Sequence, residues 1–168
     1  MIELDAEAVY RSLAARLREE VVGRDIRLVG VHTGGVWLAQ RLKADLAVPH
    51  EVGILDISFY RDDFSRSGLN PSVKPSSIAF DVEGADIVLV DDVLATGRTV
   101  RAAMNELFDY GRPARIDLAV LIDRGGRELP IAPTVVGRRI EVPEEISVVL
   151  SRDDDGRLHL TLEQRREA

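Results

Sequence analysis

Two adjacent carboxylates, Asp91 and Asp92, follow the apolar run ADIVLV at residues 85–90 and precede a short polar loop. The loop residues are Ala95, Thr96, Gly97, Arg98 and Thr99. Because helical periodicity follows, the backbone N–H groups of this loop gather at the positive end of a helix dipole, where a phosphate is stabilised. Threonine hydroxyls add donors, and glycine permits close backbone approach. The stretch therefore predicts a phosphate-binding loop.

The two carboxylates need a partner other than phosphate, because like charges repel. As acceptors, Asp91 and Asp92 suit the vicinal hydroxyls of a sugar or a bound Mg²⁺. Together with the loop they predict a site for a ribose 5-phosphate. The alternative interpretation is a pair of acids that only ends a strand and caps a helix, as aspartates often do in such turns. The sequence contains neither GxxxxGK[ST] nor GxGxxG, which excludes a Walker-type loop and the dinucleotide fingerprint.

A second glycine turn, HTGG, repeats this anion-binding arrangement. Its residues are His32, Thr33, Gly34 and Gly35, and they lie between the apolar run 26–31 and a helical pattern that ends at Leu46. The histidine alone is weak support for a site, because a surface or packed histidine is as common.

The rest of the chain alternates apolar runs with amphipathic helices. Asp5 is a candidate N-cap for a first helix, and Gly111 before Pro113 ends the helix that follows the phosphate loop. We expect strands at 26–31, 52–59, 85–90 and 116–122, with short strands in TVVG, ISVVLS and RLHLTL near the end. This order predicts an α/β fold, a mainly parallel sheet covered by helices, with ligands beyond the carboxyl ends of the strands.

Composition limits the possible functions. The 168 residues are 45% hydrophobic, which favours one domain over 1–168, and the net charge of −7 argues against indiscriminate binding to nucleic acid or anionic membranes. The absence of cysteine excludes disulfides, thiolate metal sites and cysteine nucleophiles. No apolar segment approaches the roughly 18 residues of a membrane span, and MIELDAEAVYRSL lacks the layout of a signal peptide, so we expect a cytoplasmic protein.

The segment IVLVDDVLATGRT resembles the phosphoribosylpyrophosphate (PRPP) motif of type I phosphoribosyltransferases. Around it, LDISFYRDDFSR, ELFDYGRPARIDLAVLIDRGGRELPI and VVG resemble the PyrR family of pyrimidine operon attenuation proteins and uracil phosphoribosyltransferases. The resemblance extends from about Asp5 to Val149. It implies the type I phosphoribosyltransferase fold, a mainly parallel twisted sheet flanked by helices, with a flap and a small C-terminal hood. It also implies a Mg²⁺-dependent reaction in which uracil and PRPP give uridine 5'-monophosphate (UMP) and pyrophosphate.

The resemblance further implies roles for individual residues. Asp91, Asp92 and Arg61 are the expected catalytic residues, with Mg²⁺ held by the ligand near the two acids and Arg61 within a flap at about 60–77. The expected loop for pyrophosphate is His32 to Gly35, and the expected base-binding residues are Asp123, Arg124, Val135 and Val136. Relatives often carry an arginine at the position of Gly34 and an aromatic residue at that of Val135.

Two other functions compete with this interpretation. The family name implies an attenuator that senses UMP or UTP and binds pyrimidine-operon leader RNA, for which the candidate residues are Arg11, Arg18, Arg138 and Arg139. Solvated arginines with no RNA contact are the simpler explanation of these four. A purine phosphoribosyltransferase shares the PRPP motif, but FYRDD and DRGGRELPI speak against it. The resemblance also implies a homo-oligomer, a dimer or tetramer.

Overall fold

The computed structural model describes residues 4–57 and 76–166, and its centre is a five-stranded parallel sheet. The strand order is β2-β1-β3-β4-β5, so β3 is the central strand. The strands are β1 (Ile26–Val31), β2 (Gly53–Leu55), β3 (Asp86–Leu94), β4 (Arg115–Asp123) and β5 (Val135–Arg139). The predicted α/β class with a parallel sheet is confirmed.

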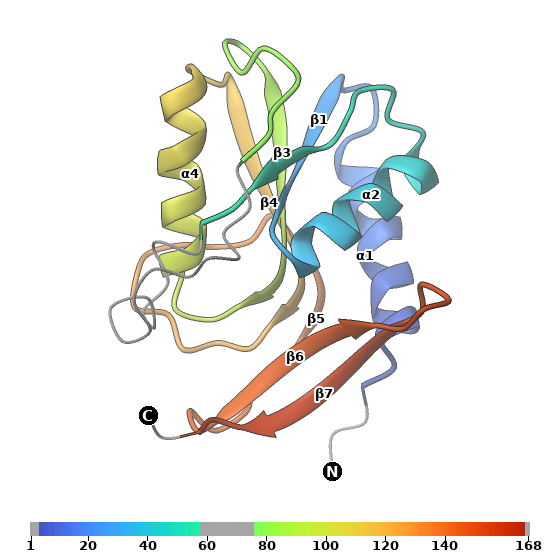
Figure 1. Ribbon diagram of the computed structural model, residues 1–168, viewed down its shortest axis with the longest axis vertical. Helices are drawn as coiled ribbons and strands as arrows, with labels where there is room; N and C mark the ends of the chain where they lie inside the picture. Colours follow the sequence, from blue (N-terminus) through green and yellow to red (C-terminus); the bar gives the residue numbers. More distant parts are fainter. Residues whose placement is uncertain (1–3, 58–75, 167–168) are drawn as a thin grey trace.

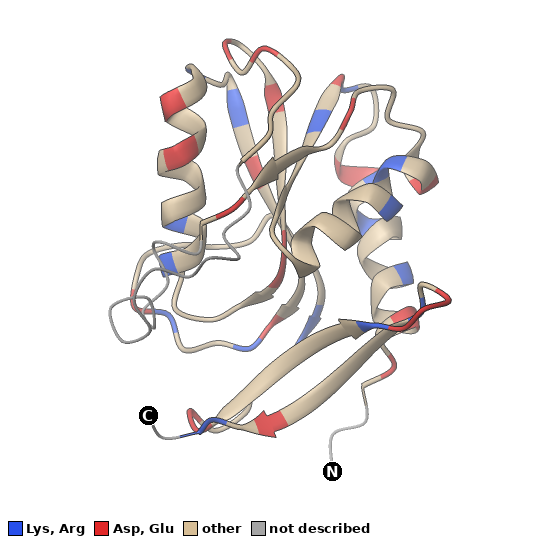
Figure 2. Cartoon of the chain, viewed as in Figure 1, with Lys and Arg blue, Asp and Glu red and all other residues tan. Residues whose placement is uncertain are grey.

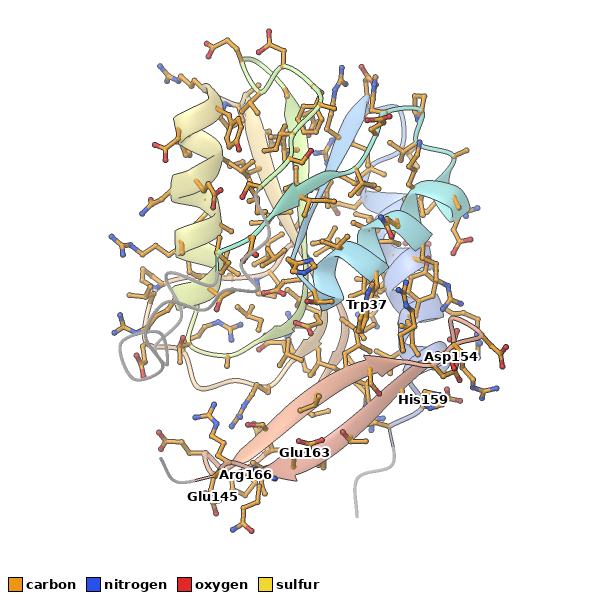
Figure 3. The ribbon with its side chains drawn as sticks, in the orientation of Figure 1. Trp37, Glu145, Asp154, His159, Glu163 and Arg166 are labelled. Carbon is orange, nitrogen blue, oxygen red and sulfur yellow. The ribbon has the colours of Figure 1, made fainter. Side chains whose placement is uncertain are left out.

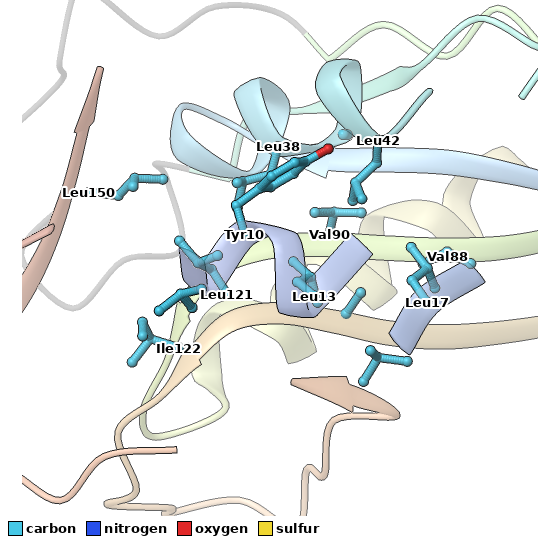
Figure 4. Packing of buried hydrophobic residues seen from close by; sticks show 14 of the residues in the cluster. Tyr10, Leu13, Leu17, Leu38, Leu42, Val88, Val90, Leu121, Ile122 and Leu150 are labelled. Carbon is cyan, nitrogen blue, oxygen red and sulfur yellow. The ribbon is translucent and has the colours of Figure 1, made fainter. Parts of the chain in front are cut away.

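Helices cover both faces of this sheet. They are α1 (Ala6–Glu20), α2 (Gly34–Leu46) and α4 (Arg98–Tyr110). Because successive strand residues point to opposite faces, Val88 and Val90 of β3 pack with α1 and α2, whereas Ile87 and Leu89 pack with α4. Figure 1 shows α4 on one side of the sheet and the other two helices on the opposite side, and Figure 4 shows the core beneath α1 and α2. None of the helices in the described ranges has the length and apolar character of a membrane span.

A C-terminal hairpin lies across the carboxyl ends of the strands (Figure 1). Its strands are β6 (Ile146–Arg152) and β7 (Leu158–Gln164), paired antiparallel around a turn that contains Gly156. Val148 and Leu150 are buried against the core of the α1 and α2 face. The Arg152 guanidinium lies 4.8 Å from the centre of the Trp37 ring on α2. The predicted hood is therefore present, whereas Arg61 and nearly all of the predicted flap at 60–77 lie outside the described residues.

Most predicted elements have the expected boundaries. The Asp5 side chain accepts a hydrogen bond from the Ala8 N–H at 3.1 Å and caps α1, and β1 spans the predicted residues. Strand β2 ends at Leu55, because the Asp56 N–H donates to the Ser76 hydroxyl at 3.0 Å instead of a sheet partner. The last two residues of the strand expected at 52–59 lie outside the described residues.

Candidate active site

The polar loops that the sequence singles out lie along one edge of the sheet. Strand β3 pairs in parallel with β1 on one side and with β4 on the other. The HTGG turn after β1, the residues after Leu94 and the end of β4 at Asp123 are therefore neighbours at the carboxyl edge. This is the edge at which open α/β sheets bind ligands.

The predicted phosphate loop connects β3 to α4. Gly97 is the N-cap of α4 and has a φ of 92°, a conformation that favours glycine. A Cβ atom at Gly97 would lie 2.9 Å from the Ile131 Cγ1, so the loop also packs tightly against the segment that follows β4. The Arg98 N–H donates to the Thr96 hydroxyl at 3.2 Å, which helps to close the turn.

The carbonyl groups of this loop point to one side. The Leu94 carbonyl accepts from the Arg124 N–H at 3.0 Å, and the Thr96 carbonyl accepts from two N–H groups, those of Glu128 and Leu129, at 3.0 and 3.1 Å. The Ala95 carbonyl accepts from Arg127 at 3.0 Å. In a trans peptide the N–H of the next residue points away from the carbonyl. The loop N–H groups therefore point away from the 124–129 segment, as an anion site requires.

The two acids belong to the strand itself. The apolar run was expected to end before them, but β3 continues in register with β4 as far as Leu94. Asp91 is 4% exposed and Asp92 is half-buried. Because neighbouring strand residues point to opposite faces, Asp91 is directed toward the α4 side and Asp92 toward the α2 side. The two carboxylates therefore lie on opposite faces of the sheet near the same edge.

The HTGG turn lies directly against Asp92. A Cβ atom at Gly34 would be 2.4 Å from the Asp92 Oδ2, and one at Gly35 would be 2.4 Å from the Val90 carbonyl oxygen. The His32 N–H donates to the Leu55 carbonyl at 2.8 Å, and the peptide bond that follows His32 is cis. The two glycines thus let the turn approach β3 more closely than any other residue type allows.

An ion pair that the sequence interpretation missed fixes the end of β4. Arg127 donates to both carboxylate oxygens of Asp123, at 2.9 and 2.7 Å, and to the Ile131 carbonyl at 2.8 Å. Burial opposes ionisation of the Asp123 carboxyl, but the hydrogen bonds from Arg127 and the Gly125 N–H outweigh it, so the pKa of Asp123 is lowered. The i,i+4 spacing of Asp123 and Arg127 in DRGGR is the signal that could have indicated the pair.

Arg124 is buried and bound to the hood. Its guanidinium donates to the Ile146 carbonyl and, at 3.0 Å, to the Pro143 carbonyl. Burial of this guanidinium lowers the pKa of Arg124, and the nearby positive charge of Arg165 lowers it further. The structure thus places Arg124 beneath the segment that leads into β6.

Val135 and Val136 lie away from the edge. They pair with Ala119 and Val120 in the middle of β4, and both are buried in the core. The β5 residue opposite Asp123 is Arg139, whose Nε lies 3.8 Å from the Asp123 Oδ2. The parallel register thus brings Arg139 to the edge beside Asp123 and leaves the two valines below it.

The four arginines proposed for RNA do not form one patch. Arg18 donates to the Asp45 carbonyl at 2.7 Å and lines a hollow with Ile26, the first residue of β1. Arg11 shares a second hollow along α1 with Arg18, whereas Arg138 and Arg139 lie at the opposite, carboxyl edge of the sheet. Figure 2 shows that lysine and arginine positions are distributed over several separate elements.

The family model for the phosphoribosyl transferase domain matches residues 3–153. A protein of Ralstonia nicotianae named "Bifunctional protein PyrR" is 50% identical over 157 residues, which cover 92% of this chain and 90% of that protein. The chain belongs to the PyrR family of phosphoribosyl transferases. A second PyrR protein, from Pseudomonas entomophila, is 51% identical over 146 residues, which are 85% of each chain.

Solved structures agree with this family at the level of the fold. A hypoxanthine phosphoribosyltransferase from Staphylococcus aureus superposes with a TM-score of 0.65 at 20% identity, covering 89% of this chain and 81% of that one. A Trypanosoma cruzi hypoxanthine phosphoribosyl transferase gives 0.64 at 23% identity, covering 87% and 80%. The predicted type I phosphoribosyltransferase fold of this PyrR-family chain is confirmed.

Proposed function

We propose that this PyrR-family protein transfers the phosphoribosyl group of PRPP to uracil, forming UMP and releasing pyrophosphate. The observation that carries the proposal is the loop from Ala95 to Thr99, whose carbonyls are turned away from the edge at which Asp92 and the HTGG turn meet. That edge combines a cradle for a 5'-phosphate, acceptors for sugar hydroxyls and a second backbone turn for an anion. A substrate with two anionic groups on one ribose matches all three.

The reaction exchanges one bond at the anomeric carbon of the sugar. The bond to the pyrophosphate oxygen breaks, a bond to N1 of uracil forms, and the N1 proton leaves. The N–H groups of the 95–99 loop bind the 5'-phosphate and fix the sugar in place. Asp91 and Asp92 accept hydrogen bonds from the ribose hydroxyls, while the turn from His32 to Gly35 holds the departing pyrophosphate. Positioning and electrostatics supply the catalysis, without a covalent intermediate.

The uracil is proposed to lie between the end of β4 and the hood. Asp123 lies at this end of β4 with both of its carboxylate oxygens bound to Arg127. Arg124 holds the Pro143 and Ile146 carbonyls over the same place. Backbone groups of this segment are available for the edge of a planar base. The PyrR names of relatives that are about 50% identical favour a pyrimidine as that base.

The residues present fit a Mg²⁺ ion that enters with the substrate. Within residues 4–57 and 76–166, no group of three or more histidine, aspartate and glutamate side chains could hold a metal ion. Asp91 and Asp92 offer the carboxylate oxygens that Mg²⁺ prefers, and the phosphate oxygens of PRPP would complete its coordination. When bound, the ion neutralises charge on the pyrophosphate.

One incubation tests the proposal. Purified protein is mixed with PRPP, Mg²⁺ and one of uracil, hypoxanthine or guanine, and the nucleotide formed is identified by chromatography. We expect UMP with uracil and little product with either purine. A purine nucleotide as the main product would reassign the base, and no product with any base would reject the transferase.

A second function, binding of leader RNA, is proposed beside the first because the relatives are named bifunctional. A pyrimidine-operon leader hairpin and a scrambled hairpin are titrated with and without UMP. Preference for the leader that changes with UMP supports regulation, since a ligand shifts binding only by favouring one state. Equal, weak binding of both hairpins rejects it.

A further inference from the structure

The side chain of Arg127 holds the phosphate loop from behind. Its NH1 donates both to the Ala95 carbonyl and to the Asp123 Oδ1, its NH2 to the Asp123 Oδ2, and its Nε to the Ile131 carbonyl. One half-buried guanidinium therefore joins the loop after β3, the end of β4 and the segment that leads to β5. A planar, forked group is needed to reach all three in fixed geometry.

The bond to Ala95 sets the direction of one peptide in the loop. The neighbouring carbonyls, those of Leu94 and Thr96, are held by backbone N–H groups, so no side-chain substitution removes their partners. The Ala95 carbonyl instead accepts its hydrogen bond from a side chain, that of Arg127, at 3.0 Å. If this peptide rotates, the Thr96 N–H leaves the cradle and a carbonyl oxygen takes its place, which repels phosphate.

We propose that Arg127, oriented by Asp123, is a positioning residue that keeps the Ala95 carbonyl out of the phosphate cradle. The inference deepens the proposed function and rests on it. Arg127 touches no reacting atom in this assignment, since four of its five N–H groups donate to the Asp123 carboxylate and to two carbonyls. Its contribution is specific to the phosphate end of the ligand, and the binding of the base and sugar does not depend on it.

The test compares ligands with and without phosphate. Dissociation constants for ribose 5-phosphate, UMP and uridine are measured by calorimetry for wild type, Arg127→Gln and Arg115→Gln. Arg115 is the matched control, because it pairs with Asp117 on the same strand at 3.0 Å but at the opposite edge of the sheet. We expect Arg127→Gln to weaken ribose 5-phosphate and UMP by about tenfold or more and to leave uridine within about twofold. The control should bind all three ligands as wild type does.

A milder variant covers the case in which Arg127→Gln does not fold. Arg127→Lys keeps the charge but loses the fork, and we expect it to weaken ribose 5-phosphate by about threefold or more while uridine is unaffected. Unchanged affinity for ribose 5-phosphate in a folded variant overturns the inference, as does an equal loss for uridine. Wild type that binds no ribose 5-phosphate overturns it too. Binding needs no turnover, so a failure of the proposed reaction is seen separately, as absence of nucleotide in the incubation with PRPP.

Discussion

At the scale of single residues, the two glycines of the HTGG turn differ in what surrounds them. The position of a Cβ atom at Gly35 is occupied by backbone, the Val90 carbonyl oxygen of the central strand. The position of a Cβ atom at Gly34 is occupied by the Asp92 carboxylate, which can rotate about its side-chain bonds. The Gly35 contact therefore constrains the packing of α2 on β3, whereas the Gly34 contact involves the side chain of a candidate site residue.

The glycine contrast gives a prediction. Gly35→Ala should lower the free energy of unfolding by about 1–3 kcal/mol, because β3 cannot move without disturbing the core. Gly34→Ala should change stability by less than about 1 kcal/mol but reduce UMP formation, because the Asp92 carboxylate is displaced. Denaturant unfolding and the transfer assay measure the two effects. Equal destabilisation by the two variants would contradict this assignment.

The acids are tested one at a time. Asp91→Asn and Asp92→Asn should each lower kcat/KM for PRPP by about 10- to 100-fold, since each removes a charge-assisted hydrogen bond to a sugar hydroxyl. Asp109→Asn, an exposed residue of α4, is the control and should have the activity of wild type. Near-normal rates in both site variants would remove the acids from the mechanism.

Residue types predicted one part of the candidate site and did not indicate Arg127. Asp91, Asp92 and the 95–99 loop are contiguous in the chain, so their chemistry is visible in the sequence. The bond from Arg127 to Ala95 joins residues that are 32 positions apart and depends on how β3 and β4 align. A linear pattern does not contain that register, and for this reason Arg127 was not predicted.

At the scale of elements, Glu7 connects two helices and the hood. Its carboxylate accepts two hydrogen bonds from Arg41 of α2, at 3.0 and 2.6 Å, and one from the Leu158 N–H of β7 at 2.9 Å. The Arg41 hydrogen bonds, despite opposition from burial, hold the pKa of Glu7 at about 2, below its ordinary 4.5. A carboxylate whose pKa is lowered on folding stabilises the folded state above its unfolded pKa.

This linkage predicts a pH effect. Replacing Glu7 with glutamine should cost about 1–3 kcal/mol of unfolding free energy at pH 7. The difference from wild type should shrink as the pH falls from about 4.5 toward 2, because protonation removes the same charge from wild type. Unfolding by urea at a series of pH values measures it, with Glu19→Gln on the exposed face of α1 as the control. A difference that stays constant with pH would contradict the role of the Glu7 charge.

Helices and long strands were easier to predict than short strands. The helical period and the Asp5 cap located α1, and β1 is a continuous apolar run. Strand β2 stops at Leu55 because a hydroxyl distant in the chain captures the next N–H. The apolar pattern also could not tell that Val135 and Val136 lie in the middle of the sheet, since both a core position and a base pocket accept valine.

At the scale of the whole molecule, the residues that flank the undescribed segment 58–75 meet at the sheet. Ile54 and Ser77 exchange two backbone hydrogen bonds of 2.8 Å each, in an antiparallel bridge. The chain therefore returns to β2 at the place where it leaves. The expected catalytic residue Arg61 belongs to the segment between these points.

A variant without residues 58–75 tests whether this segment is needed for folding or only for activity. Replacing residues 58–75 by a short Gly/Ser linker should shift the melting temperature by no more than about 5 °C, because the bridge already holds the two ends together. The same change should abolish UMP formation, since it removes Arg61, while ribose 5-phosphate still binds at the 95–99 loop. Calorimetry and the transfer assay check both expectations. Retained turnover would exclude Arg61 from the reaction.

The contact between Trp37 and Arg152 has a practical consequence. Trp37 is the only tryptophan of the chain, and it stands on α2, one turn after the HTGG turn and beside the hood (Figure 3). Indole emission depends on the charges and solvent around the ring, so the intrinsic fluorescence of the protein reports the place where the hood meets the body. Tryptophan fluorescence thus provides a label-free signal for displacement of the hood in rapid-mixing experiments. Loss of the signal change in Arg152→Ala would show that it arises from the contact between Arg152 and Trp37.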